Sequence, residues 1–389
     1  RTAYEANIAL FFLVLGLVLF FSSFKKPFLL LFSSPSLAIS FLAYRAEVIV
    51  IPVLILALLY LFFRNPERRS GVNIFLISVA MIVGLFIISP LLVLIPTAGF
   101  MARSSELNIT FGLREFLSLY SSYFSPRYLF SIGDSGPRSS FPDFGTFYQW
   151  QFPLYLFGLY QILKIKNSSR FKIFIFTLLL ISPIPAALTK DPYTTIRSLI
   201  MVVPLTVIMA YGLTEITTRF SFLKYKHLYL ISGFIILYST IKLFLSIFFF
   251  NDYFRSRYWD MGWKQITESI KSLNQKLPII ADTARGEPYI HLLFHLQYDP
   301  AVYQRDNTGL DLFEYYTNTN RNKNIQIGNI TLKSFRWGVD TDRVEKYLIT
   351  DSQAISRAQI DYHKLSVIDE IKLPDGTVAF RILKTNPTQ

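Results

Sequence analysis

The sequence contains no cysteine among its 389 residues and only four histidines. Without cysteine, the chain has no disulfide framework, no thiolate zinc site, no iron–sulfur cluster and no cysteine nucleophile. Charged residues are also scarce: they make up 17% of the chain, against about 25% in soluble domains, whereas 52% of the residues are hydrophobic and 16% are aromatic. This composition is not that of an ordinary soluble domain, and it predicts a membrane protein.

Acidic residues are scarcer than basic ones, and the imbalance is confined to the apolar part of the chain. The net charge is +13; residues 1–250 contain 21 Lys and Arg against 9 Asp and Glu, whereas residues 251–389 contain 18 against 17. A nucleic-acid-binding domain would carry its basic face on a soluble fold, so we expect no nucleic-acid partner. We therefore predict two domains, 1–250 in the membrane and 251–389 outside it.

The apolar domain contains several stretches of the length that a bilayer demands. A membrane-crossing helix needs about 20 mostly apolar residues. The sequence therefore predicts a mainly α-helical, polytopic domain of about eight helices, of which the second, third and fifth are short. The stretches are 4–23, 28–44, 47–63, 73–96, 149–165, 172–189, 198–217 and 228–250.

The basic residues orient these stretches, because Lys and Arg of short loops stay on the cytoplasmic side of a membrane. Four connections, 24–27, 64–71, 164–172 and 218–227, contain 12 Lys and Arg and a single acidic residue. If the helices alternate in direction, all four connections lie on the cytoplasmic side. The loops 44–47, 97–148 and 190–197 and the C-terminal domain then lie on the opposite, extracytoplasmic side.

The polar domain reads as a small α/β fold. No Gly-rich phosphate loop occurs in it, so we expect no nucleotide cofactor. The hydrophobic spacing predicts helices over 263–275 and 286–297, and alternating or continuous apolar runs predict strands. The predicted strands are 278–281, 324–332, 346–350 and 364–372, and the segment 374–377 is a predicted hairpin turn.

Two of the four histidines stand four residues apart in one predicted helix. His291 and His295 would lie on one helix face, as half of a zinc site does, but the segment HLLFH lacks the Glu that metalloproteases place after the first His. We favour a structural role for both and expect no cofactor. A requirement for a divalent metal stays open, since no clear set of ligands occurs.

Charged and tyrosine side chains gather at the outer ends of the predicted spans. Interfacial anchoring or a loop ion pair would account for any one of them, but the set favours a binding site. The residues are Arg1 and Glu5 at the mouth of the first span, Tyr44, Arg45 and Glu47 in the turn 44–47, Asp134 and Arg138 in the loop 97–148, and Lys190, Asp191, Tyr193 and Arg197 in the loop 190–197.

These residue types suit a phosphate and a sugar. Arginine matches phosphate oxygens with two parallel hydrogen bonds, and carboxylates orient sugar hydroxyls or accept the proton of an attacking hydroxyl. The headgroup of a long lipid phosphate would lie at this depth of the membrane. The set therefore predicts transfer of a group from a lipid phosphate at the outer face.

Several segments resemble the GT-C superfamily of integral-membrane glycosyltransferases, and most closely its bacterial members related to protein O-mannosyltransferases and to the aminoarabinose transferase. The resemblance extends over nearly all of the chain. The segments are RTAYEANIALFF at 1–12, YRAEVIVIP at 44–52, YFSPRYLFSIGDSGPRSSFPDFGTFY at 123–148, TTIRSLIMVVPLTVIMAYGL at 194–213 and GEPYIHLLFHLQYDPAVYQ at 286–304.

The resemblance implies an inverting enzyme of the bacterial cytoplasmic membrane. It implies transfer of a hexosyl or pentosyl group from a polyprenyl-phosphate donor, itself a membrane lipid, to a hydroxyl of a protein, lipid or glycan. Arg1 and Arg197, with Arg45 and Arg138, would bind the donor phosphate. Asp134, Asp191 and Tyr193 would support them.

The resemblance also implies where the catalytic base should be. The acidic residue that serves as base in the family belongs to a first extracytoplasmic loop, which would precede Arg1. We therefore expect the sequence to lack an N-terminal segment and this fragment to be inactive alone. Glu5 is the nearest candidate among the residues present.

Two other classes of protein fit the same spans. A secondary transporter or lipid flippase would use the outer charges to line a pathway. Transporter helices are often interrupted in the membrane, and the segment SPIP at 182–185 interrupts the sixth span in this way. No internal repeat is evident, however. A non-catalytic sensor or scaffold would use the C-terminal domain to bind cell-wall material.

Overall fold

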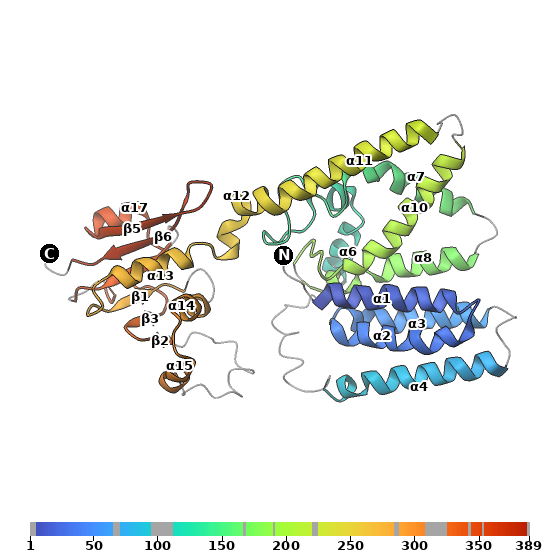
Figure 1. Ribbon diagram of the computed structural model, residues 1–389, viewed down its shortest axis with the longest axis horizontal. Helices are drawn as coiled ribbons and strands as arrows, with labels where there is room; N and C mark the ends of the chain where they lie inside the picture. The colour runs from blue at the N-terminus through green and yellow to red at the C-terminus, as the bar shows by residue number, and fades with distance from the viewer. Residues whose placement is uncertain are drawn as a thin grey trace. The chain divides into compact units, whose positions relative to one another are not determined.

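The computed structural model describes residues 5–64, 71–94, 112–165, 169–189, 191–219, 225–283, 288–307, 325–340, 344–351 and 354–386 (Figure 1). The chain divides into two compact units, Arg1–Thr240 and Ile241–Gln389. This division lies earlier than the predicted boundary at residue 250 and falls inside helix α11, Tyr225–Leu245, which runs unbroken through it.

The first unit is built of helices, as the long apolar stretches predict. Five helical stretches of the described residues are long and apolar enough to cross a membrane: Glu5–Ser22, Asn73–Leu91, Arg170–Ala187, Leu199–Arg219 and Tyr229–Trp259. The predicted stretches at 28–44 and 47–63 form the shorter apolar helices Pro27–Ala43 and Glu47–Phe63. The elements are α1 Glu5–Ser22, η1 Pro27–Leu29, α2 Leu30–Ala43, α3 Glu47–Phe63, α4 Gly71–Leu94, α6 Leu113–Ser122, η3 Tyr128–Ile132, η4 Gln149–Gln151, α7 Phe152–Lys164, α8 Ser169–Ile181, α9 Ile184–Ala187, η5 Leu199–Met201, α10 Val202–Arg219 and α11.

Small and hydroxyl residues bring the first two helices together. The Ser33 hydroxyl donates to the Gly16 carbonyl oxygen at 2.7 Å, and the Ser40 hydroxyl donates to the Ala9 carbonyl oxygen at 2.8 Å. Between lipid-exposed helices such contacts replace the hydrophobic driving force that water would supply. Figure 1 shows α1 and α2 side by side, and α3 packs against α2.

A pair of glycines joins α7 to α10. A Cβ added to Gly158 would overlap the Ile208 carbonyl oxygen, and one added to Gly212 would overlap the Leu154 carbonyl oxygen. The two helix backbones therefore touch at this crossing, which only glycine permits.

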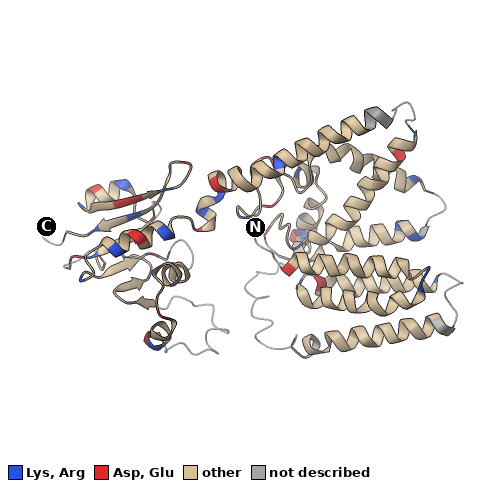
Figure 2. Cartoon of the chain, viewed as in Figure 1, with Lys and Arg blue, Asp and Glu red and all other residues tan. Residues whose placement is uncertain are grey.

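Basic residues lie at one end of this helical unit. Figure 2 shows Lys and Arg at the right-hand side, where α7 and α10 end and α8 begins, and beside the connection between α1 and α2. This arrangement agrees with helices that alternate in direction. The side of the membrane that this end faces stays a prediction.

The second unit contains a six-stranded mixed sheet in its described residues, with the order β2-β3-β1-β4-β6-β5. β1 pairs in parallel with both β3 and β4, and the remaining pairs are antiparallel. Its elements are η6 Ser246–Phe250, α12 Asn251–Arg255, η7 Ser256–Trp259, α13 Trp263–Ser272, β1 Ile279–Ala281, α14 Pro288–Leu296, α15 Pro300–Asp306, β2 Ile325–Ile327, β3 Ile330–Leu332, β4 Tyr347–Thr350, α17 Arg357–Tyr362, β5 Ser366–Lys372 and β6 Val378–Lys384.

Helices cover both faces of this sheet. Ile279 and Ala281 of β1 pack in one hydrophobic cluster with Trp263 of α13, whereas Ile280 packs in a second cluster with Ile360 of α17. Successive strand residues point to opposite faces, so the fully apolar run at 279–281 suits a central strand buried on both sides. The predicted helices, the strand at 278–281 and the α/β character of this unit are confirmed.

One predicted strand is wrong. The prediction was one strand over 324–332, but residues 325–332 form a tight antiparallel hairpin, in which Ile327 of β2 pairs with Ile330 of β3. Gly328 adopts a left-handed backbone with φ of 58°, which reverses the chain within an alternating pattern that otherwise reads as a single strand. The predicted turn at 374–377 is confirmed between β5 and β6, with Gly376 at φ of 82°.

Candidate functional site

The candidate site is built where the loop after α6 meets the segment before η5. The first of these loops folds back on itself, because the Phe147 amide donates to the Leu129 carbonyl oxygen at 2.7 Å. Gly145 makes this return possible, since a Cβ there would overlap the backbone of Phe130. Gly133, with φ of 61°, begins the return and places Asp134 at its edge.

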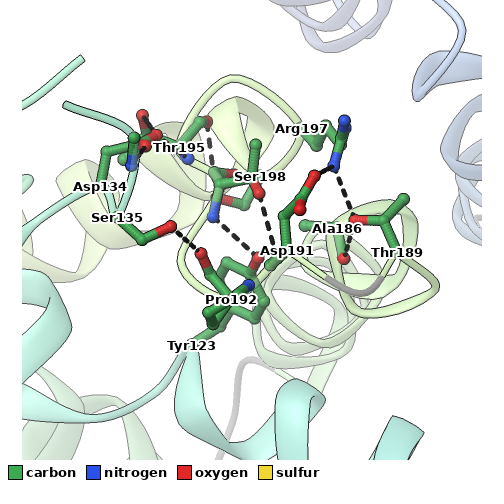
Figure 3. A network of polar contacts seen from close by, with 12 residues as sticks. Tyr123, Asp134, Ser135, Ala186, Thr189, Asp191, Pro192, Thr195, Arg197 and Ser198 are labelled. Atoms are coloured by element: carbon green, nitrogen blue, oxygen red, sulfur yellow. Dashed lines mark hydrogen bonds and ion pairs between the residues drawn. The ribbon is translucent and has the colours of Figure 1, made fainter. Parts of the chain in front are cut away.

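Asp134 joins the two loops (Figure 3). Its Oδ1 accepts the Gly136 amide at 2.6 Å, and its Oδ2 accepts both the amide of Thr195 at 2.6 Å and the Thr195 hydroxyl. The residue is only 8% exposed. Oδ2 therefore holds the two loops together, and Oδ1 shapes the turn within the first loop.

Ser135 connects the same two loops through a second pair of hydrogen bonds. The Ser135 amide donates to the Tyr193 carbonyl oxygen at 3.2 Å, and the Ser135 hydroxyl donates to the Pro192 carbonyl oxygen. Tyr193 has a left-handed backbone with φ of 53°, a conformation that costs a side-chain-bearing residue about 1–3 kcal/mol. Its ring stacks on Tyr128 at 5.1 Å, so packing and hydrogen bonds hold this strained turn in place.

Two buried tyrosines bond to the residues that follow the turn at Tyr193. The Tyr123 hydroxyl accepts the Thr194 amide at 3.0 Å, and the Tyr128 hydroxyl lies 3.0 Å from the Ser198 hydroxyl. Burial raises the pKa of the Tyr123 phenol and of the Tyr128 phenol. Both hydroxyls are therefore neutral at physiological pH and act as structural hydrogen-bonding groups.

Arg197 lies at the open side of this network. Its Nη1 donates to the Thr189 hydroxyl oxygen at 2.8 Å and to Asp191 Oδ2 at 3.0 Å, and the Thr189 hydroxyl donates to the Ala186 carbonyl oxygen at 2.8 Å. The side chains of Arg197 and Asp191 are 20% and 67% exposed. Among the described residues Arg197 bonds through Nη1, so the other edge of its guanidinium keeps its donors for another acceptor.

The structure brings together four of the predicted site residues. Figure 3 shows Asp134, Asp191 and Arg197, and the Ser135 amide bonds to the Tyr193 carbonyl oxygen beside them. Two predicted residues, Arg1 and Lys190, lie outside the described residues. The other predicted phosphate ligands and the candidate base are exposed: Glu5 at the first residue of α1, Arg45 in the turn between α2 and α3, and Arg138 in the turn after Asp134.

Sequence reasoning missed the uncharged members of the site. Tyr123, Thr189, Thr195 and Ser198 hold the network together, but such residues occur throughout the chain without a distinctive spacing. Glu47 was noted for its charge, yet its burial was not foreseen. It is 1% exposed, and its Oε2 has no hydrogen-bond partner among the described residues.

No group of three or more His, Asp or Glu side chains in the described part of the chain is placed to hold a metal ion. His291 Nε2 lies 3.8 Å from Asp260 Oδ2, and its ring stacks on Trp263 at 6.0 Å with an interplanar angle of 2°. His295 packs edge-on against Phe294 at 5.1 Å. Each of these two histidines therefore has an aromatic neighbour, and their structural role stays a prediction.

No protein-family model, curated protein or solved structure matches the chain. The functional argument accordingly depends on the apolar helices, on the geometry around Arg197 and on the chemistry that this geometry permits.

Proposed function

We propose that the protein is a membrane glycosyltransferase, which transfers a monosaccharide from a polyprenyl-phosphate donor to an acceptor hydroxyl at the outer face of a bacterial cytoplasmic membrane. The observation that carries the proposal is the position of Arg197. Thr189 holds one edge of its guanidinium, and two loops that are far apart in the sequence lock the backbone around it.

A fixed arginine suits the leaving group of this reaction. As the bond between the anomeric carbon and the phosphate oxygen breaks, negative charge develops on the polyprenyl phosphate. A guanidinium that is already in place stabilises this charge without reorganising. Asp191 is exposed and contributes little as a surface ion-pair partner, so the singly charged phosphodiester of the donor can displace it from Arg197. The second negative charge then develops beside Arg197 as the polyprenyl phosphate leaves.

The other half of the reaction is attack on the anomeric carbon. The acceptor oxygen forms the new bond to that carbon, and its proton passes to a carboxylate acting as general base. Asp134 is unsuited to this step because both of its oxygens already accept hydrogen bonds. Among the described residues the candidate for this role is Glu5, which is exposed at the start of α1, a helix that packs against η5.

The experiment is a transfer assay with the intact protein in proteoliposomes and a radiolabelled polyprenyl-phosphate sugar. Arg197→Ala should abolish transfer, and Arg197→Lys should retain a small part, because lysine keeps the charge but loses the planar fork. Arg305→Ala is the matched control, since Arg305 is 75% exposed and belongs to the second unit. Full turnover by Arg197→Ala would remove Arg197 from the site.

One observation favours a second candidate function, a lipid flippase or secondary transporter. The sixth predicted span is broken, since α8 ends at Ile181 and α9 begins at Ile184 after Pro183. Broken helices build the substrate sites of many transporters. The same proteoliposomes separate the two functions: a flippase would move a labelled polyprenyl phosphate between the leaflets without transferring its sugar.

A further inference from the structure

Three parallel strands of the second unit end at one edge of its sheet. β3, β1 and β4 are neighbours, and Ala281 of β1 is in register with Leu332 on one side and with Ile349 on the other. The Asp282 amide continues this alignment past β1, because it donates to the Ile349 carbonyl oxygen at 2.9 Å. We call this edge the carboxyl edge. Its residues are Asp282 and Thr283 after β1, Lys333 and Ser334 after β3, and Asp351 after β4.

The chain leaves β1 and β4 towards opposite faces of the sheet. After β1 it forms α14, whose Leu292 packs with Ile279 in one hydrophobic cluster. After β4 it forms α17, whose Ile360 packs with Ile280 in the cluster on the other face. Adjacent parallel strands with diverging connections form a topological switch point, and open α/β sheets bind ligands outside the carboxyl ends of strands at such a point. The topology therefore favours a ligand site at the carboxyl edge.

Hydroxyls and a carboxylate are within reach of a ligand at this edge. The Thr283 hydroxyl lies 3.3 Å from the Ser334 hydroxyl, so the ends of β1 and β3 present two hydroxyls side by side. Asp282 and Thr283 are half-buried, and Ser334 is exposed. A hydroxyl both donates and accepts hydrogen bonds, and a carboxylate accepts them with the added strength of its charge. These groups suit a ligand that carries hydroxyls of its own.

The charges around this edge disfavour an anion and a metal ion. Lys333 is paired with Asp340, which is 2% exposed, so the charge of this lysine is already balanced within the protein. The two basic residues Lys333 and Arg336 stand against the three acidic residues Asp282, Asp340 and Asp351, which gives a net charge of −1. Within the described residues, no three His, Asp or Glu side chains are placed to hold a metal ion. A neutral ligand therefore fits the edge best.

Two aromatic rings follow the hydroxyls. Phe335 and Trp337 come directly after Ser334, both are half-buried, and their ring centroids lie 4.8 Å apart. The face of an aromatic ring is electronegative, so it attracts the polarised C–H groups of a sugar ring. Aromatic side chains with a few well-placed polar groups are the usual lining of small-molecule sites. Hydroxyls, a carboxylate and aromatic rings together match a sugar, which has polar edges and an apolar face.

We propose that the carboxyl edge of the second unit binds a carbohydrate. Asp282 accepts hydrogen bonds from sugar hydroxyls, Thr283 and Ser334 exchange hydrogen bonds with them, and the aromatic pair packs against a ring face. The further assignment of this carbohydrate as the acceptor glycan rests on the proposed function.

The test measures carbohydrate binding by the intact protein in detergent. Fluorescently labelled protein is applied to an array of oligosaccharides from bacterial cell envelopes, and the Kd of the strongest ligand is then measured in solution. We expect binding that neutral oligosaccharides compete for and inorganic phosphate does not. Binding to no oligosaccharide of the array, or competition by phosphate alone, would overturn the proposal.

Two variants place the binding at the carboxyl edge. Asp282→Asn removes the carboxylate charge and keeps the backbone bond to Ile349, whereas Ser334→Tyr fills the edge with a ring. Each should raise the Kd about tenfold or more, because a hydrogen bond to a charged group contributes about 1.5–3 kcal/mol and a displaced ligand loses all its contacts. The matched control is Ser272→Tyr, since Ser272 is exposed at the end of α13, before β1 begins. Unfolding temperatures show that each variant is folded, and an unchanged Kd in Asp282→Asn and Ser334→Tyr would contradict the site.

Transfer kinetics test the acceptor role separately. With the oligosaccharide found on the array as acceptor, Asp282→Asn should raise the acceptor KM about tenfold and leave kcat and the donor KM unchanged, because the lost contact lies away from the reacting atoms. An unchanged acceptor KM would refute the acceptor role. If the unaltered protein transfers no sugar, the proposed function fails, whereas the array and the Kd values still decide whether the carboxyl edge binds a carbohydrate.

Discussion

At the scale of single residues, the hydroxyl of Thr189 fixes the position of the Arg197 guanidinium. Thr189 is 6% exposed and bonds to both Arg197 and the Ala186 carbonyl oxygen, so it connects the guanidinium to the end of α9. The sequence placed Arg197, Asp191 and Tyr193 in one outer loop through their charge and ring. It could not indicate Thr189 or Thr195, because a hydroxyl in a loop has no distinctive pattern.

Thr189→Val should lower transfer from the polyprenyl-phosphate donor by about 10–100-fold, because a hydrogen bond to a charged group contributes about 1.5–3 kcal/mol. Valine keeps the shape of threonine, so the loss reports the position of Arg197. Initial rates in proteoliposomes measure it, with Thr214→Val as the control, since within the described parts of the chain the Thr214 hydroxyl bonds to carbonyl oxygens of its own helix. An unchanged rate would show that Thr189 does not position Arg197.

A second residue-scale prediction concerns the pH dependence of stability. Arg381 beside Glu370, at 2.8 Å between Nε and Oε1, lowers the pKa of the Glu370 carboxyl from its ordinary value. A carboxyl with a lowered folded-state pKa adds stability at neutral pH, and this stability is lost as the pH falls through the ordinary glutamate pKa of about 4.3 and then through the lower folded value.

Glu370→Gln should therefore lower the unfolding temperature of the intact protein at pH 7 and have a smaller effect below about pH 4. Thermal unfolding across pH, followed by circular dichroism, measures the difference. Glu268→Gln, at an exposed position of α13, is the control. A difference that stays constant across this pH range would contradict the assigned ion pair.

At the scale of elements, close approach of backbones determines which helices pair. α7 and α10 touch at Gly158 and Gly212, and β2 and β3 turn at Gly328. Hydrophobic periodicity predicted the long apolar helices, α13, α14 and most strands, because it reflects burial of one residue at a time, but it did not predict the short helices α6, α15 and α17. It could not predict the β2–β3 turn, because the alternation of apolar residues continues through it.

Gly158→Ala should destabilise the protein by about 1–3 kcal/mol, since the added methyl group would force α7 away from the Ile208 carbonyl oxygen. The unfolding temperature in detergent measures the effect. Gly233→Ala in α11 is the matched control, because a Cβ there meets nothing within 4 Å. That variant should be neutral or stabilised, because alanine favours a helix over glycine by about 1 kcal/mol. An equal loss in both variants would show that the close crossing is not the cause.

At the scale of the whole molecule, the absence of cysteine offers a direct test of orientation. Lys271→Cys places a single thiol at an exposed position of α13, and Lys25→Cys places one in the connection after α1. If the C-terminal unit is extracytoplasmic, a membrane-impermeant maleimide added to intact cells should label the first variant and not the second. The reverse result would invert the predicted orientation and place the Arg197 network on the cytoplasmic side.

The sequence alone determined that apolar helices dominate the first part of the chain and that a small α/β unit follows it. Both follow from local quantities, because the free energy of burying a side chain depends mainly on that side chain. Only the tertiary structure decided that Asp134 bonds to Thr195, that Thr189 bonds to Arg197 and that α2, α3 and α4 line an apolar cavity. These contacts join residues far apart in the chain and depend on hydrogen-bond geometry and on backbone approach, which no local pattern of residues encodes.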